Sequence, residues 1–132
     1  MKCNIICSVF FVTCLASLKA QKINIGNVFL DAEQQTQVML QNIPTAKKGI
    51  SDLVSPRTIE NAELKLVSSR DWTSGFFPGQ LWTLYEYTGK DHWKQQAQTF
   101  TANIEREKTN AVTHDMGFKV YCSFGSGYRL TK

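Results

Sequence analysis

Two neighbouring segments with different hydrophobic patterns set the strongest limit on how this chain can fold. Residues 92–107, HWKQQAQTFTANIERE, repeat apolar side chains every three or four positions and are polar on the opposite side, which predicts a helix with one buried face. The apolar stripe consists of Trp93, Ala97, Phe100 and Ile104. Residues 115–124, DMGFKVYCSF, are apolar on almost all sides, which is typical of an internal helix. Outer and inner helices that alternate along the chain predict an all-α fold built from α/α hairpins.

Two other segments carry signals of helix ends. Asp31 is a good N-cap and Pro44 disfavours a helical residue before it, so a helix is predicted over residues 31–42. Residues 78–88, PGQLWTLYEYT, are predicted to form a second helix, because Gly89 suits the left-handed residue that ends many helices.

The segment between these two helices is the least regular part of the sequence. Residues 43–71 are punctuated by Pro44, Gly49 and Pro56, which favour turns. The stretch AELKLVSS at 62–69 alternates apolar and polar residues, which allows a short extended piece. We expect a long irregular loop here and no β-sheet core. Near the other end of the chain, the glycines of the GSG sequence at 125–127 are expected to end the helix before them.

The first twenty residues have the organisation of a secretory signal peptide. Lys2 precedes an apolar run, and a cut is expected after Ala20. The run is too short to span a bilayer comfortably, and no other stretch is long and apolar enough to do so. The sequence therefore predicts export to the periplasm or the outside of the cell, with a lipoprotein attached through Cys14 as the weaker alternative.

Charge and cysteine content narrow the classes of function. Lys2 and Lys19 lie in the predicted signal peptide, so its removal lowers the net charge from +4 to +2, and no basic run argues for nucleic acid binding. Three of the four cysteines also lie in that segment, so the mature chain has no internal disulfide. Cys122 remains, and its apolar surroundings predict a small core residue rather than a nucleophile.

Two loops rich in aromatic residues precede helices that are expected to face inward, at 70–79 and 110–118. Loops at the ends of rigid helices often carry binding residues. Trp72 in the first loop is either a stacking platform for a sugar or a residue that fills a gap between helices. Gly75 and Gly79 permit close backbone approach or a positive φ angle.

Asp115 has two sharply different interpretations. It is either a helix N-cap or a carboxylate that faces a cavity at the start of a helix. Glycoside hydrolysis usually needs two carboxylates, and Asp71 is the other one in these loops, although it can simply pair with Arg70. His92 and His114 have no metal-ligand spacing.

The two loops carry a specific resemblance. LKLVSSRDWTSGFFPGQLWTLYEYTGKDHW followed by THDMGFKVYCSFGSGYRLT closely resembles the N-terminal part of glycoside hydrolase family 88, the unsaturated glucuronyl hydrolases, over roughly residues 50–132. The resemblance implies an (α/α)6 barrel that releases unsaturated uronic acid from oligosaccharides made by polysaccharide lyases. The reaction implied begins with hydration of the C4=C5 double bond, without a metal or organic cofactor. The partners implied are unsaturated oligosaccharides of glycosaminoglycan type or of related uronic-acid polysaccharides.

The resemblance also assigns roles to individual residues. It implies that Asp115 is one of two catalytic carboxylates, that His114 binds the sugar and that Trp72 lines its subsite. The second catalytic aspartate of the family lies in a later segment, so residues 21–132 are expected to be the N-terminal portion of a barrel domain, inactive alone. The alternative is a degenerate carbohydrate-binding helical module without catalysis.

Overall fold

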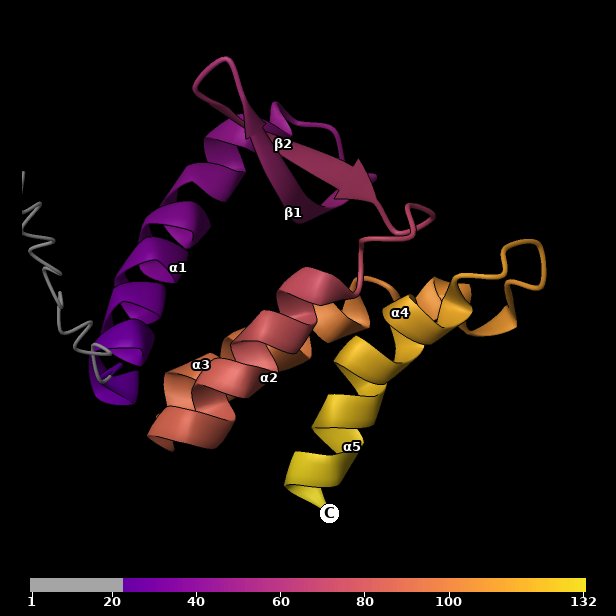
Figure 1. Ribbon diagram of the computed structural model, residues 1–132. Coiled ribbons are helices and arrows are strands. Elements are labelled where there is room, and N and C mark those ends of the chain that lie inside the picture. The colour runs from indigo at the N-terminus through magenta and orange to yellow at the C-terminus, as the bar shows by residue number, and fades with distance from the viewer. Residues whose placement is uncertain (1–22) are drawn as a thin grey trace, which may run out of the picture.

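The computed structural model describes residues 23–132, so the predicted signal peptide lies outside the described residues (Figure 1). The helices are α1 Ile25–Lys47, α2 Phe76–Thr88, α3 Asp91–Ala102, α4 Met116–Val120 and α5 Ser126–Thr131, with a 3₁₀ turn at Glu105–Thr109, a π-helical turn at Tyr121–Gly125, and strands β1 Leu53–Glu60 and β2 Glu63–Ser68. Within this range, none of the helices has the length and apolar character needed to cross a membrane.

The core forms where α2 packs between α3 and the last helical segment. Figure 1 shows α2 and α3 lying side by side, with α5 on the other flank of α2. The buried cluster consists of Phe77, Leu81, Trp82, Leu84, Trp93 and Ala97. Trp93, Ala97 and Ile104 are at most 2% exposed, so the stripe predicted on residues 92–107 is confirmed, although the α-helix ends at Ala102. Gly89 follows α2 with φ 67°, as predicted.

Helix α1 is longer than predicted at both ends. Asn24 caps it by accepting a hydrogen bond from the backbone of Asn27, and Asp31 lies inside the helix. Pro44 is also inside, in the last turn, where a missing N–H removes one helical bond without breaking the helix. Thr36 is its buried residue and accepts a hydrogen bond from Gln80 on α2 at 2.7 Å. The packing of α1 therefore depends partly on polar contacts, which the signals at its ends did not indicate.

Residues 53–68 form an antiparallel hairpin, so the predicted irregular loop is wrong there, whereas the short extended piece allowed at 62–69 is present as β2. Asn61 and Ala62 both have positive φ, of 50° and 62°, as the tight turn between two strands requires. Pro56 lies at a register shift in β1, where a missing N–H is tolerated. The hairpin buries Leu66 but adds no residue to the core cluster, so the fold class stays all-α.

The last helical segment runs from residue 116 to 131 without a break. Gly125 and Gly127 lie within it and do not end it, in contrast to the prediction. Gly127 serves close packing, because a Cβ at this position would lie 2.8 Å from the indole of Trp82. The buried positions are Lys119, Ser123 and Gly127, four residues apart. Phe118, Tyr121 and Tyr128 are exposed within the described chain, with Tyr121 at 78%, so the predicted burial on all sides is wrong here.

Candidate active site

Two glycines bring the two predicted loops together. The Trp72 loop (residues 70–75) leads into α2, and the Asp115 loop (residues 110–115) leads into α4. A Cβ on Gly75 would lie 2.4 Å from the carbonyl oxygen of Phe118, and one on Gly79 would lie 2.9 Å from that of Cys122. Side chains at these positions would push α2 and the last helical segment apart. The glycines thus permit the close backbone approach that their sequence suggested.

An aromatic wall forms where the loops meet. The rings of Trp72, Phe76 and Phe118 lie edge to face, with centroids 5.6 to 5.9 Å apart. Each remains at least 40% exposed within residues 23–132, so Trp72 lies outside the buried core of the described chain. An exposed indole held by two other rings offers a rigid apolar face to a ligand.

Asp115 and His114 lie next to this wall. Asp115 occupies the N-cap position of α4, but its side chain makes no capping hydrogen bond, so the cap interpretation holds for position only. Its carboxylate is 29% exposed, and Oδ1 lies 3.5 Å from Nε2 of His114, whose side chain is 95% exposed. Both residues line a surface cavity of about 320 Å³. The other lining residues are Gly117, Phe118, Tyr121 and Cys122.

Asp71 is engaged in a different way. Its Oδ1 accepts hydrogen bonds from the backbone and hydroxyl of Thr73, at 2.8 and 2.6 Å, and Oδ2 lies 3.1 Å from Arg57. Burial pushes the pKa of Asp71 upward, but the bonds from Thr73 and the charge of Arg57 outweigh it and hold the pKa below its ordinary value. The expected pairing with Arg70 is wrong, and the carboxylate shapes its own loop.

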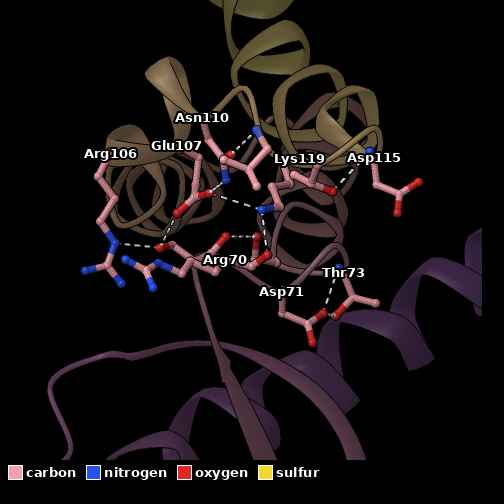
Figure 2. A network of polar contacts seen from close by, with 12 residues as sticks. Arg70, Asp71, Thr73, Arg106, Glu107, Asn110, Asp115 and Lys119 are labelled. Atoms are coloured by element: carbon pink, nitrogen blue, oxygen red, sulfur yellow. Dashed lines mark hydrogen bonds and ion pairs between the residues drawn. The ribbon is translucent and has the colours of Figure 1, made fainter.

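A buried ion pair between the loops was not found from sequence. Figure 2 shows Lys119 reaching Glu107, while the carboxylate of Asp115 points away from this network. The only sign of this pair in the sequence was a single lysine within an otherwise apolar helical segment. Spacing alone, however, does not tell a buried lysine from an exposed one.

Cys122 is partly buried, and burial raises the pKa of its thiol. Cys122 also lines the cavity that contains Asp115, so the prediction of a core residue is wrong. A thiol that ionises less readily is a poor nucleophile. Between residues 23 and 132, no three His, Cys, Asp or Glu side chains gather closely enough to hold a metal ion.

Comparisons with known proteins identify the relatives of this chain. No family model matches. The chain is 41% identical over 111 residues to an unsaturated glucuronyl hydrolase of Formosa agariphila, covering 84% of this chain and 27% of the relative. It is 29% identical over 83 residues to an unsaturated chondroitin disaccharide hydrolase of Streptococcus pneumoniae, covering 60% of this chain and 20% of the relative.

A solved structure gives the same answer for the fold. A crystal structure of an unsaturated glucuronyl hydrolase specific for heparin matches 76% of this chain and 27% of its own, at 34% identity and a TM-score of 0.59. That neighbour has an α/α-barrel fold, so the predicted fold class is confirmed. The chain spans about a quarter of the length of these relatives. Over the residues compared, it is therefore a homologue of the unsaturated glucuronyl hydrolases of glycoside hydrolase family 88, as its motifs indicated.

Proposed function

We propose that this chain supplies one carboxylate and one aromatic wall to the active site of an unsaturated glucuronyl hydrolase. The observation that carries the proposal is the contact between Trp72 and Phe118, whose ring centroids lie 5.9 Å apart. It joins two sequence motifs 46 positions apart, and Phe118 shares its cavity with Asp115 and His114. An apolar platform beside a cavity that contains a carboxylate suits a charged sugar ring.

The chemistry proposed is the addition of water to the C4=C5 double bond of a terminal uronate. This step needs a proton donor at C4 and a group that accepts a proton from the water that attacks C5. The product is a hemiketal, which rearranges and breaks the glycosidic bond. Asp115 suits either proton-transfer role, because the hydrogen bonds that occupy Asp71 have no counterpart on its carboxylate among the described residues.

The neighbouring side chains have supporting roles in this proposal. His114 is exposed next to Asp115, so its imidazole is placed to hydrogen-bond a sugar hydroxyl or the uronate carboxylate. Trp72 stacks its exposed indole on the C–H face of the sugar ring. Asp71 is committed to its own loop, so the second carboxylate comes from another part of the protein.

The substrate class proposed is unsaturated oligosaccharides of glycosaminoglycan type. Two relatives are named for unsaturated glucuronyl and unsaturated chondroitin disaccharide hydrolysis, and the structural neighbour is described as specific for heparin. We also propose that the protein is exported and cut after Ala20. N-terminal sequencing of the protein recovered from its source tests that cut, and a chain beginning at Met1 would refute it.

A chimera tests the proposed activity. The aligned segment of the Formosa agariphila relative is replaced by residues 23–132 of this chain, and the absorbance of the C=C bond is followed with unsaturated chondroitin and heparin disaccharides. We expect turnover by the chimera and a loss of at least about a hundredfold in its Asp115→Asn variant. A folded chimera that binds the sugar without turnover would instead favour the carbohydrate-binding alternative.

A further inference from the structure

The ion pair between Lys119 and Glu107 has no part in the proposed chemistry, yet it is the most deeply buried charge pair in the described chain. The side chains are 0% and 5% exposed, and Nζ lies 3.1 Å from Oε2. An apolar pair of similar volume is often as stable as a buried ion pair, so burial alone does not explain why charges occupy these positions. What the two side chains touch suggests a more specific role.

Lys119 connects the two loops that form the candidate site. It follows Asp115 by four residues, so it lies one turn further along the same helical segment. Its ammonium group donates a hydrogen bond of 2.7 Å to the backbone carbonyl of Arg70, the first residue of the Trp72 loop. A single side chain thus holds the backbone of one loop against the helix that begins with the other (Figure 2).

Glu107 collects hydrogen bonds from the ends of both loops. Ser69, directly before the Trp72 loop, donates to Oε1 at 2.7 Å, and Asn110, the first residue of the Asp115 loop, donates to Oε2 at 2.7 Å. Lys119 donates to the same Oε2. Burial pushes the pKa of Glu107 upward, but the bonds from Asn110, Ser69 and Lys119 outweigh it and hold the pKa below its ordinary value.

These contacts lie beside the candidate site and do not involve the side chains of Trp72, His114 or Asp115. Figure 2 shows the carboxylate of Asp115 pointing away from the network that Lys119 and Glu107 form. Every buried side-chain polar atom within residues 23–132 has a hydrogen-bond partner, so the network is complete as it stands. A complete network of this kind specifies one arrangement of the backbone segments that it joins.

We propose that Lys119 and Glu107 are positioning residues, whose ion pair fixes the Trp72 loop in register with the helix that begins at Asp115. Trp72 and Phe118 then meet edge to face, and Phe118 lines the same cavity as Asp115. The relevance to catalysis rests on the proposed function, whereas the register itself is a property of the fold.

The test neutralises both charges at once, because removing one partner leaves a buried unpaired charge and unfolds many proteins. Lys119→Met with Glu107→Gln is made in the 132-residue chain, and ring-to-ring nuclear Overhauser contacts are recorded. We expect the contact between Trp72 and Phe118 to be lost, because it joins the two loops. The contact between Trp72 and Phe76 is retained, because both residues lie on the α2 side.

Amide hydrogen exchange gives a second readout of the same variant. The amides of Asp71 and Ser74 are bonded within the Trp72 loop, to Ser68 and Asp71 respectively, and we expect their exchange to accelerate about tenfold. The amide of Gly89, bonded to Tyr85 at the far end of α2, should keep its rate. A loss of protection at all three amides would mean that the pair serves general stability and would overturn the proposal.

Two further sets of variants keep the test decisive if the double variant does not fold. Ser69→Ala and Asn110→Ala each remove one hydrogen bond to Glu107 and leave the ion pair, so they should weaken the contact between Trp72 and Phe118 without abolishing it. Glu86→Gln with Arg129→Met removes an exposed ion pair between α2 and α5 as a matched control. Unchanged ring contacts in both alanine variants would contradict the proposal.

Titration with unsaturated chondroitin disaccharide separates this proposal from the proposed function. If the double variant still binds the sugar and keeps both ring contacts, the positioning role is refuted and the proposed function stands. The contact between Trp72 and Phe118 lost in the double variant, together with a chimera with the Formosa agariphila relative that never binds the sugar, would refute the proposed function and leave the register role standing.

Discussion

Two acid–base pairs flank the start of α4, and they differ in nearly every physical respect. Glu107 and Lys119 lie 3.1 Å apart, almost fully buried, and Glu107 accepts three side-chain hydrogen bonds. Asp115 and His114 lie 3.5 Å apart, and the histidine side chain is 95% exposed. The comparison teaches that proximity of charges does not indicate function. A buried carboxylate that accepts several hydrogen bonds holds the fold, and one left open at a cavity can act on a ligand.

The largest expected effect comes from breaking the buried pair on one side. Lys119→Met leaves Glu107 buried without its counter-charge, so we expect the free energy of unfolding to fall by about 3 to 5 kcal/mol. Asp115→Asn, made as the matched change in the open pair, should alter it by less than about 0.5 kcal/mol. Chemical denaturation of both variants measures the two values, and similar losses would remove the distinction between the pairs.

The next largest effect should be a dependence of the free energy of unfolding on pH, caused by the buried pair. The folded-state pKa of Glu107 lies below its ordinary value of 4.5, so the stability that it contributes is fully present above that value. This contribution is lost as the pH falls through the lower folded-state pKa. Denaturation curves from pH 7 down to pH 3 should therefore decline more steeply for the wild type than for Glu107→Gln with Lys119→Met. Parallel curves would show that Glu107 does not link pH to folding.

Asp71 should give an intermediate result, because it is engaged but less buried. Asp71→Ala removes the bonds from Thr73 and the pair with Arg57, so we expect a loss of about 2 kcal/mol. Asp71→Asn keeps one acceptor for Thr73 and should lose about half as much. An Asp71→Ala variant as stable as the wild type would mean that open and engaged carboxylates differ less than their contacts indicate.

The smallest effect is expected at an exposed pair. Arg129 lies 2.6 Å from Glu86, and both side chains are at least 45% exposed to solvent, which screens their attraction. Glu86→Gln should leave the midpoint of denaturation unchanged within error at moderate salt. A clear shift would show that an exposed pair also ties α2 to α5.

The two motifs predicted loops that lie together in the structure, because their residues are close in sequence to strong local signals. Trp72 and Asp115 each precede a helix by a few residues, and glycines between the helices allow their loops to meet. Lys119 escaped prediction, because a lysine among apolar residues usually extends its charge to water, and only tertiary contacts show otherwise. The ion pair needed Glu107, which lies in a turn that periodicity assigned to a helix.

Elsewhere, sequence signals failed where local chemistry was unusual. The hairpin turn uses Asn61 and Ala62, and alanine rarely adopts a positive φ, so no standard turn signal was present. The proline within β1 further weakened the strand pattern. Helix α1 carries Pro44 and depends on the polar contact of Thr36, neither of which a hydrophobic pattern can register.

The π-helical turn at Tyr121–Gly125 has a consequence for how the length of this helix can change. Lys119 and Gly127 are eight residues apart, which on a regular α-helix would place them about 80° apart around the axis. The wide turn, in which the amide of Ser126 bonds to the carbonyl of Tyr121, absorbs much of that rotation. Deleting one residue from the turn would leave seven, within about 20° of two full turns. We therefore expect the helix to accommodate the deletion of one residue there, with Lys119 and Gly127 still on the same face.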